Sequence, residues 1–242
     1  MKKHVYRELY DLEKSYWWNV GRRKLAVQVL KPYFKEKKPT ILDFGCGAGI
    51  TMKEMERYGK VFGVDTSEES IKFCKMRNIR NVQKINGYED IKYKNMDAVL
   101  LMDVLEHIEM ENDALKKINS LLNKEGKLFI TVPAYQFMWS YWDEEAHHYR
   151  RYSKKKLINV LEKNNFRIVR AGYFYSFLLP VAMVFRLVRS LLPKKKETSD
   201  FVRLPYIINW LLIRLSDFER NILKILPVPF GLSVFCLAQK KN

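Results

Sequence analysis

The residues best suited to chemistry in this chain are three glycines with one acidic residue before them and another further on. Gly45, Gly47 and Gly49 stand at alternate positions shortly after Asp43. Glycine lets the backbone turn tightly and pass close to a ligand. Asp65 follows at the end of the next short apolar run. Such an acid accepts hydrogen bonds from ribose hydroxyls, so the pattern predicts a nucleoside-binding turn.

The spacing of the glycines distinguishes between two nucleotide cofactors. A dinucleotide fingerprint, Gly-x-Gly-x-x-Gly, that began at Gly45 would require glycine at the position of Ile50. A pyrophosphate binds the bare start of a helix, whereas an amino-acid tail also needs an acid for its ammonium group. Asp43 supplies that acid, so the pattern favours S-adenosylmethionine (SAM), with S-adenosylhomocysteine (SAH) as product, over NAD.

The elements that must position these residues alternate along the chain. Apolar runs typical of buried parallel strands are separated by charged segments with helical periodicity. We expect strands near 40–44, 61–64, 81–85, 97–102, 127–132, 166–170 and 231–238, and helices near 50–58, 67–78, 111–123, 153–164 and 205–226. This order predicts an α/β fold whose ligands bind at the carboxyl ends of the strands.

The motifs together resemble those of class I SAM-dependent methyltransferases. The resemblance rests on residues 42–49, on Val64-Asp65 and on Leu105-Glu106-His107. It implies a Rossmann-like, seven-stranded mixed sheet with an antiparallel last strand, extended by an N-terminal helical cap and a C-terminal helical insertion. The boundaries that we expect are a cap at 1–39, a SAM-binding α/β core at 40–172, an insertion at 173–228 and the last strand at 229–242.

The resemblance also assigns cofactor contacts. Asp43 and the glycines would hold the methionine end, Asp65 the ribose, and Asp103 and Val104 would lie near the methionine. Relatives usually place an acid where Tyr88 stands, so Glu89 or Asp90 must serve the adenine, or backbone and apolar contacts must hold it. The predicted cofactor contacts are Asp43, Gly45, Cys46, Gly47, Gly49, Asp65, Thr66, Glu89, Asp90, Asp103 and Val104.

A loop dense in aromatic, histidine and arginine residues, here called the aromatic loop, occupies residues 133–152 after the fifth expected strand. Loops at this edge carry specificity because the scaffold tolerates their variation. Aromatic rings can form an apolar slot, arginines can fix a phosphate or carboxylate, and a histidine can take a proton. In the structural alternative, His148 and Arg150 tie the loop to its own backbone.

The aromatic loop resembles that of a bacterial and archaeal subgroup similar to the ubiquinone- and menaquinone-type methyltransferases, which is associated with cell-surface glycan or lipid pathways. The pair Trp17-Trp18 with Arg22 before the glycines is interpreted as a lid, or alternatively as part of a packing helix. The candidate general bases are His107 and His148, although Glu106 and His107 could instead cap the next helix. No metal-binding cluster is apparent. The predicted acceptor contacts are Trp17, Arg22, Tyr135, Trp139, Asp143, Arg150, Arg151 and Tyr152.

The net charge of +17 indicates nucleic acid, an anionic membrane surface or an acidic substrate, unless the lysines are spread over an ordinary surface. The uncharged run 171–185 would reach only about 22 Å as a helix, short of the roughly 30 Å hydrocarbon core, and Pro180 interrupts it. Arg186, Arg189 and Lys194–Lys196 follow. This pattern is typical of a helix in the headgroup plane, with a soluble lid as the alternative.

Apolar residues in 204–226 recur at alternating steps of four and three, from Leu204 through Leu211 and Phe218 to Ile225. Such a seam packs on another insertion helix or on a second subunit, which would give a homodimer. Cys46, Cys74 and Cys236 form no metal or disulfide pattern. With no signal peptide expected, we predict a cytoplasmic location, peripheral at the inner face of the cell membrane.

The function that these patterns predict is methyl transfer from SAM to a lipid or lipid-linked acceptor, of glycan or quinone-like type, at a membrane surface. A soluble small molecule or a sugar is the alternative acceptor. An RNA methyltransferase would explain the charge, but the chain lacks an Asn-Pro-Pro-Tyr-type motif and a Pro-Cys nucleophile, so a nucleic-acid partner is not favoured. A non-catalytic adapter that binds SAM at a membrane is the remaining alternative.

Overall fold

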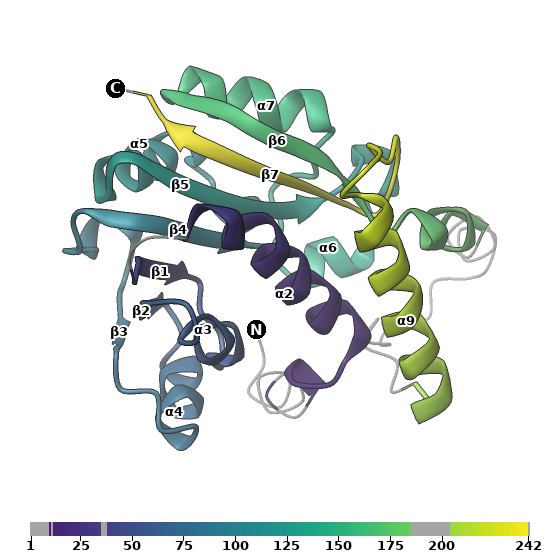
Figure 1. Cartoon of the computed structure of the whole chain (residues 1–242), viewed down its shortest axis with the longest axis horizontal. Helices are drawn as coiled ribbons and strands as arrows, with labels where there is room; N and C mark the ends of the chain where they lie inside the picture. Colours follow the sequence, from purple (N-terminus) through teal and green to yellow (C-terminus); the bar gives the residue numbers. More distant parts are fainter. Residues whose placement is uncertain (1–9, 11, 35–37, 185–203, 242) are drawn as a thin grey trace.

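The computed structural model describes residues 10, 12–34, 38–184 and 204–241 (Figure 1). Its strands form one seven-stranded sheet of order β3-β2-β1-β4-β5-β7-β6. All neighbours are parallel except β7, which is antiparallel to both β5 and β6. The predicted Rossmann-like sheet with an antiparallel last strand is confirmed. The strands are β1 (Thr40–Phe44), β2 (Lys60–Asp65), β3 (Val82–Lys84), β4 (Met96–Met102), β5 (Leu122–Pro133), β6 (Phe166–Phe174) and β7 (Ser233–Lys240).

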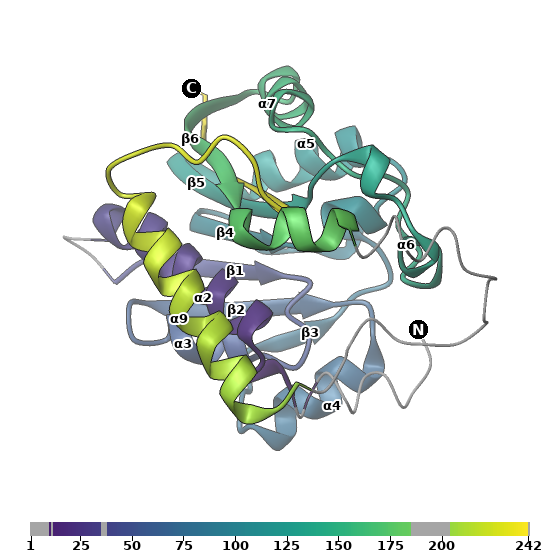
Figure 2. The ribbon, with the colours of Figure 1, turned by 90° about the vertical axis from the view of Figure 1, so that its right-hand side faces the viewer.

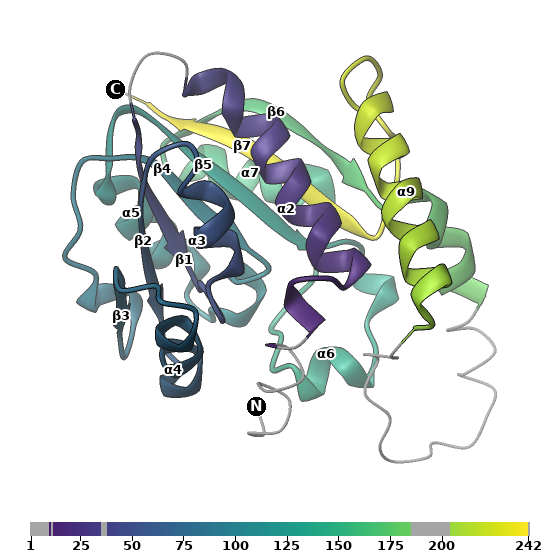
Figure 3. The ribbon, with the colours of Figure 1, turned by 60° about the horizontal axis from the view of Figure 1, so that its bottom comes forward.

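Helices cover both faces of this sheet. α2 lies in front of it and α5 and α7 behind it in Figure 3. Each face has its own core, one built with Leu25 and Leu30 of α2 and the other with Leu115 and Ile118 of α5. The helices are α2 (Trp17–Leu30), α3 (Ile50–Met55), α4 (Glu68–Met76), α5 (Glu111–Leu121), α6 (Tyr141–Glu145), α7 (Lys154–Lys163) and α9 (Tyr206–Ile222).

The three neighbouring strands β2, β1 and β4 end side by side. Phe44, the last residue of β1, pairs with Val64 of β2 and with Leu101 of β4. The turn after β1 has φ angles of 76°, 55° and 81° at Gly45, Gly47 and Gly49. Residues with a Cβ atom rarely adopt such positive φ angles, which explains why glycine stands at all three positions.

The insertion helix α9 packs beside α2 (Figure 2). Lys24 of α2 forms an ion pair of 2.7 Å with Asp217 of α9. The side of α9 that turns inward contains Ser216 and Glu219, both buried. The predicted seam therefore does not form this contact. Its members Leu211, Leu215 and Phe218 are 47%, 45% and 65% exposed.

Two boundaries differ from those that the sequence predicts. β5 begins at Leu122, directly after α5, because Gly126 does not interrupt the strand as expected. β6 continues to Phe174, so the core extends past residue 172. The basic positions Arg186, Arg189 and Lys194–Lys196 lie outside the described residues. Among those described, no helix has the length and hydropathy needed to cross a bilayer.

Candidate functional site

The turn that follows β1, residues 45–49, is hydrogen-bonded to the end of β2. The backbone N–H groups of Gly45 and Cys46 donate to the Val64 carbonyl at 2.8 and 3.1 Å. Gly47 donates its N–H to Oδ2 of Asp65 at 2.9 Å. The other Asp65 oxygen accepts from the Ser67 N–H at 2.8 Å. The predicted ribose acid and the glycine turn are therefore joined directly.

Asp43 lies beneath this turn in an environment that disfavours its negative charge. Its side chain is 2% exposed, and its Oδ2 has no hydrogen-bond partner among the described residues. Burial, followed by the nearby carboxylates of Glu13 and Asp65, raises the pKa of Asp43 to about 8. A buried carboxyl oxygen without a partner suits an incoming cation, such as an ammonium group.

A second acid, Glu13, covers the turn from the N-terminal segment. It forms an ion pair of 2.6 Å with Arg77, which also donates to the Ala48 carbonyl at 2.7 Å. Among the described residues, a Cβ placed on Gly47 would meet only Glu13 Oε1, at 3.6 Å, so no other described side chain covers Gly47. Glu13 could not be predicted from the sequence because no local motif links it to the glycines.

The tryptophan pair packs within the protein, as expected for a packing helix, and the lid stays a prediction. Trp17 is buried, and the ring of Trp18 stacks on Tyr175 with centroids 4.4 Å apart. From the same helix, Arg22 reaches across the sheet edge and forms an ion pair with Asp103. Its guanidinium also lies 5.7 Å from the centroid of the Trp18 ring. Arg22, predicted to contact the acceptor, is thus joined to a predicted cofactor contact.

The two candidate bases lie together although they are distant in sequence. The rings of His107 and His148 meet edge to face, with centroids 4.5 Å apart. Burial, then the neighbouring His148, lowers the pKa of His107 to about 4, so this ring is neutral near pH 7. Beside them, Glu106 is fully buried, and burial followed by the Asp103 carboxylate raises its pKa well above the ordinary range.

Asp143 organises the aromatic loop. Its oxygens accept from Nε and Nη2 of Arg151 at 2.6 and 3.0 Å and from the Ser140 N–H at 2.8 Å. Oδ1 also lies 2.9 Å from Nδ1 of His148. Burial alone would raise the pKa of Asp143, but the hydrogen bonds from His148 and Arg151 together hold it well below its usual value.

Other polar residues of the loop are engaged within the protein. Arg150 donates to the carbonyls of Ile108 and Glu109 at 2.8 and 2.7 Å. The Tyr152 hydroxyl, fully buried, donates to Glu111. These contacts tie the loop to residues 108–111, whereas the structural alternative expected Arg150 to bond the loop's own backbone. Acceptor binding by Asp143, Arg150, Arg151 or Tyr152 stays a prediction.

The remaining predicted residues lie at the surface or partly buried near it. Tyr135 is half-buried, with its ring stacked on Phe137 and Tyr173. Trp139 is also half-buried. Glu89 and Asp90 are exposed on a short 3-10 turn, where Asp90 accepts from the Asn86 N–H at 2.9 Å. The half-buried Val104 and the exposed Thr66 border the same sheet edge, and these contacts also stay predictions.

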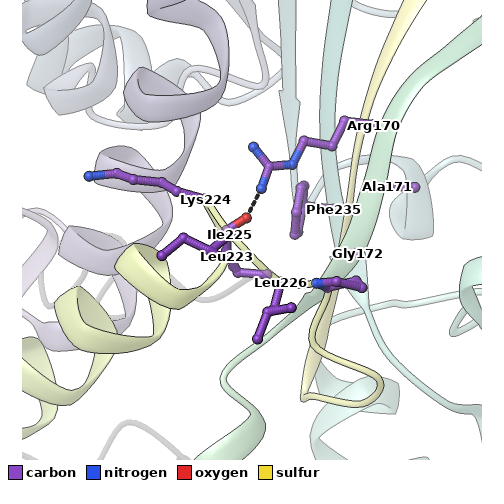
Figure 4. Close-up of a pocket in the computed structure, with 9 residues that line it drawn as sticks. Arg170, Ala171, Gly172, Leu223, Lys224, Ile225, Leu226 and Phe235 are labelled. Carbon is purple, nitrogen blue, oxygen red and sulfur yellow. Dashed lines mark hydrogen bonds between the residues drawn. The ribbon is translucent and has the colours of Figure 1, made fainter.

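A separate cleft of about 230 Å³ lies between β6 and the end of α9 (Figure 4). Arg170 crosses it and donates to the Leu223 carbonyl. None of its lining residues is a predicted site residue. It is lined by Arg170, Ala171, Gly172, Leu223, Lys224, Ile225, Leu226, Pro227 and Phe235.

Comparison with known families agrees with this geometry. A family described as "Methyltransferase domain" matches residues 19–171, more than half of the chain. The chain belongs to this methyltransferase-domain family, and its cofactor is SAM. The Asp43 oxygen, which the described residues leave without a partner, and the Gly47 backbone, which no described side chain other than Glu13 covers, fit the charged methionine tail of that cofactor.

Individual relatives are more distant. A ubiquinone biosynthesis O-methyltransferase from Pelagibacter ubique (strain HTCC1062) is 29% identical over 148 residues, which cover 53% of this chain and 62% of that relative. The match therefore spans less than two thirds of the relative's length.

Solved structures share the fold at low identity. A SAM-dependent methyltransferase from Archaeoglobus fulgidus has a TM-score of 0.57 and 22% identity, over 90% of this chain and 94% of that one. The plantazolicin methyltransferase BpumL, crystallised with SAH, has a TM-score of 0.59 and 16% identity, over 99% and 90%.

Proposed function

We propose that this protein transfers the methyl group of SAM to a hydroxyl of a lipid-borne acceptor, quinone-like or glycan-linked, at a membrane surface. The observation that carries the proposal is the outward side of α9. Ile207, Leu211, Leu215 and Phe218 follow one another at helical spacing and are 69%, 47%, 45% and 65% exposed. A surface helix normally turns such a stripe toward the core.

Polar contacts hold α9 in this orientation. Besides the pair between Lys24 and Asp217, the Arg220 guanidinium donates to the Gln28 side chain at 2.6 Å, and Gln28 donates to the Arg220 carbonyl at 2.9 Å. The inward side of α9 is thus held by charged and amide groups as well as by Leu212 and Ile213, which pack on the core, while a second apolar stripe faces outward. Contiguous exposed apolar surface of this kind marks a membrane or protein interaction site.

The chain's charge and one relative support a lipid acceptor. With a net charge of +17, the protein would be attracted to anionic lipid headgroups. The Pelagibacter ubique relative is named for O-methylation in ubiquinone biosynthesis, which supports a quinone-like acceptor, here proposed to be lipid-borne. An acceptor of that kind stays in the bilayer, so an enzyme acting on it has to reach the membrane surface.

The residues of the sheet edge have distinct tasks in this reaction. Asp43 would pair with the ammonium of the methionine tail, and Asp65, which already fixes the glycine turn, would bind the ribose hydroxyls. SAM supplies a reactive sulfonium, so the protein's main contribution is alignment of the acceptor oxygen with the methyl group and the sulfur, which can supply several kcal/mol of the barrier. The aromatic loop, held by Asp143, would border the acceptor.

The test combines vesicle flotation with product partition. Wild-type protein should float with vesicles of phosphatidylglycerol and phosphatidylethanolamine, and label from methyl-labelled SAM should enter the lipid fraction of a host extract. The double variant Ile207→Glu, Phe218→Glu should partition into vesicles on the order of 1,000-fold less, since each apolar side chain contributes about 2 kcal/mol when buried and the two together about 4 kcal/mol.

Met76→Glu on α4 is the matched control, because Met76 is also apolar and 58% exposed but lies away from α9. It should float like wild type. Label that enters only aqueous small molecules would contradict the proposal. So would a dimer, seen in sedimentation, that the double variant abolishes while vesicles bind neither protein.

A further inference from the structure

Three side chains with metal-ligating atoms converge from two separate parts of the chain. Glu106 and His107 follow β4, and His148 comes from the aromatic loop. One ligand atom from each lies within 4.8 Å of the others. Ligand atoms around a bound Zn²⁺ at about 2.1 Å lie roughly 3–4 Å apart, so small side-chain rotations would close the cluster on an ion.

Within the described ranges, Glu106 has no partner that would explain its burial. It is 0% exposed, and neither carboxyl oxygen has a hydrogen-bond partner among the described residues. Burying such a group is costly unless it is paired or coordinates a metal. The two nearby arginines form ion pairs with other acids, Arg22 with Asp103 and Arg151 with Asp143.

His148 is oriented as metal-binding histidines usually are. Its Nδ1 lies 2.9 Å from Asp143 Oδ1, and Asp143 is itself fixed by Arg151. A hydrogen bond from Nδ1 to a carboxylate leaves Nε2 as the free lone pair and sets the angle of the ring. The loop network around Asp143 therefore provides the outer support that a metal site needs.

We propose that Glu106, His107 and His148 bind one divalent metal ion of the Zn²⁺ type. Two imidazoles and one carboxylate form a donor set that suits Zn²⁺ and related transition metals rather than Mg²⁺ or Ca²⁺. Three protein ligands leave a coordination position open, as in catalytic rather than structural sites.

The open position gives the metal a role that rests on the proposed function. The ligands begin three residues after Asp103, beside the predicted methionine contacts, so an acceptor hydroxyl could fill the open position. There the hydroxyl oxygen would lose its proton to solvent and form a bond to the methyl carbon. The carbon–sulfur bond would break with its electron pair remaining on sulfur, which yields SAH.

Metal binding can be measured without SAM, acceptor or membrane. The full chain, stripped with EDTA and dialysed, is titrated with Zn²⁺ by calorimetry and with Co²⁺ by visible absorption. We expect one ion per chain, with the d–d bands of a low-coordinate Co²⁺ site. His148→Asn should weaken binding at least as much as the roughly 10–100-fold typical of losing an outer-sphere partner.

His147→Asn is the matched control, since His147 is the exposed neighbour of His148 and lies outside the cluster. It should bind both ions as wild type does. If His148→Asn proves unstable, Glu106→Gln keeps the shape of the side chain and removes the charge. Zn²⁺ should raise the thermal midpoint of the wild type and not that of Glu106→Gln.

Equal Zn²⁺ and Co²⁺ affinities for wild type and His148→Asn would overturn the metal site, as would equal loss in the His147 variant. These outcomes are independent of the acceptor. A chain that binds one ion through these residues but ignores vesicles and lipids keeps the metal site and contradicts only the proposed function.

Discussion

The glycine turn and the aromatic loop lie at the same edge of the sheet but treat their buried charges in opposite ways. Beneath the turn, Asp43 is buried with an oxygen that has no partner among the described residues. In the loop, Asp143 is equally buried but accepts hydrogen bonds from Arg151, His148 and the Ser140 backbone.

This difference in hydrogen bonding distinguishes a residue suited to bind a ligand, Asp43, from a residue that stabilises the loop, Asp143. An unsatisfied buried carboxylate lowers stability and is retained where a bound group supplies the missing partner. A satisfied one fixes the loop before any ligand arrives. Removing the first should therefore impair binding, and removing the second should impair folding.

The largest expected effect is on the loop. Asp143→Ala leaves the Arg151 guanidinium buried without its carboxylate, which should lower the free energy of unfolding by about 3–5 kcal/mol. Urea denaturation followed by tryptophan fluorescence measures this change. Glu144→Ala, at the exposed neighbouring position, should stay within about 0.5 kcal/mol of wild type. Equal midpoints for both variants would show that the network does not stabilise the fold.

The next effect is on cofactor affinity. Asp65→Ala removes the acceptor for the Gly47 and Ser67 N–H groups and the predicted ribose contact. Losing a charged hydrogen-bond partner costs about 1.5–3 kcal/mol, so the Kd for SAM should rise on the order of 10–100-fold in calorimetry. Glu162→Ala, at an exposed position of α7, should leave Kd unchanged. No heat with SAM or SAH for the wild type would refute the binding site itself.

The smallest expected effect, taken as the change in the free energy of unfolding per pH unit, comes from the titration of Asp43. Its pKa is raised to about 8 in the folded chain, mainly by burial, so between about pH 4 and 8 the folded state holds a proton that the unfolded state has released. Wild-type stability should therefore fall as pH rises through this window, by at most about 1.4 kcal/mol per pH unit.

Asp43→Asn should remove the share of that slope that comes from Asp43, while Glu106, whose pKa burial also raises, keeps its own share. The variant should be at least as stable as the wild type at pH 7 and bind SAM more weakly. Denaturation at several pH values, paired with SAM calorimetry, separates the two effects. Parallel pH profiles for both proteins would mean that the Asp43 carboxyl is ionised in the folded state, against the expected difference between turn and loop.

Local patterns were sufficient to predict the sheet and its glycine turn. Apolar runs mark β1 and β4, and the positive φ angles at Gly45, Gly47 and Gly49 are a local demand that only glycine meets easily. The seven-stranded mixed sheet with its antiparallel last strand, β7, followed from the family resemblance. Boundaries were less predictable, since β5 continues through Gly126 where a turn was expected.

Contacts between distant segments could not be predicted in this way. Glu13 reaches the turn only because Arg77 holds it there, and His148 reaches His107 only because the aromatic loop folds back. The apolar seam of α9 was read correctly as a stripe, but which side would pack on α2 depends on charged partners such as Lys24. Sequence periodicity contains no information on such partners.

The place of β7 between β5 and β6 has a consequence for synthesis on the ribosome. β5 and β6 emerge early, yet residues 175–232 must be translated before the strand that joins them appears. At roughly 5–20 residues per second this interval lasts on the order of several seconds. During it, the facing edges of β5 and β6 have no partner, so the nascent chain is most open to chaperone binding and to mispairing just before its last strand is made.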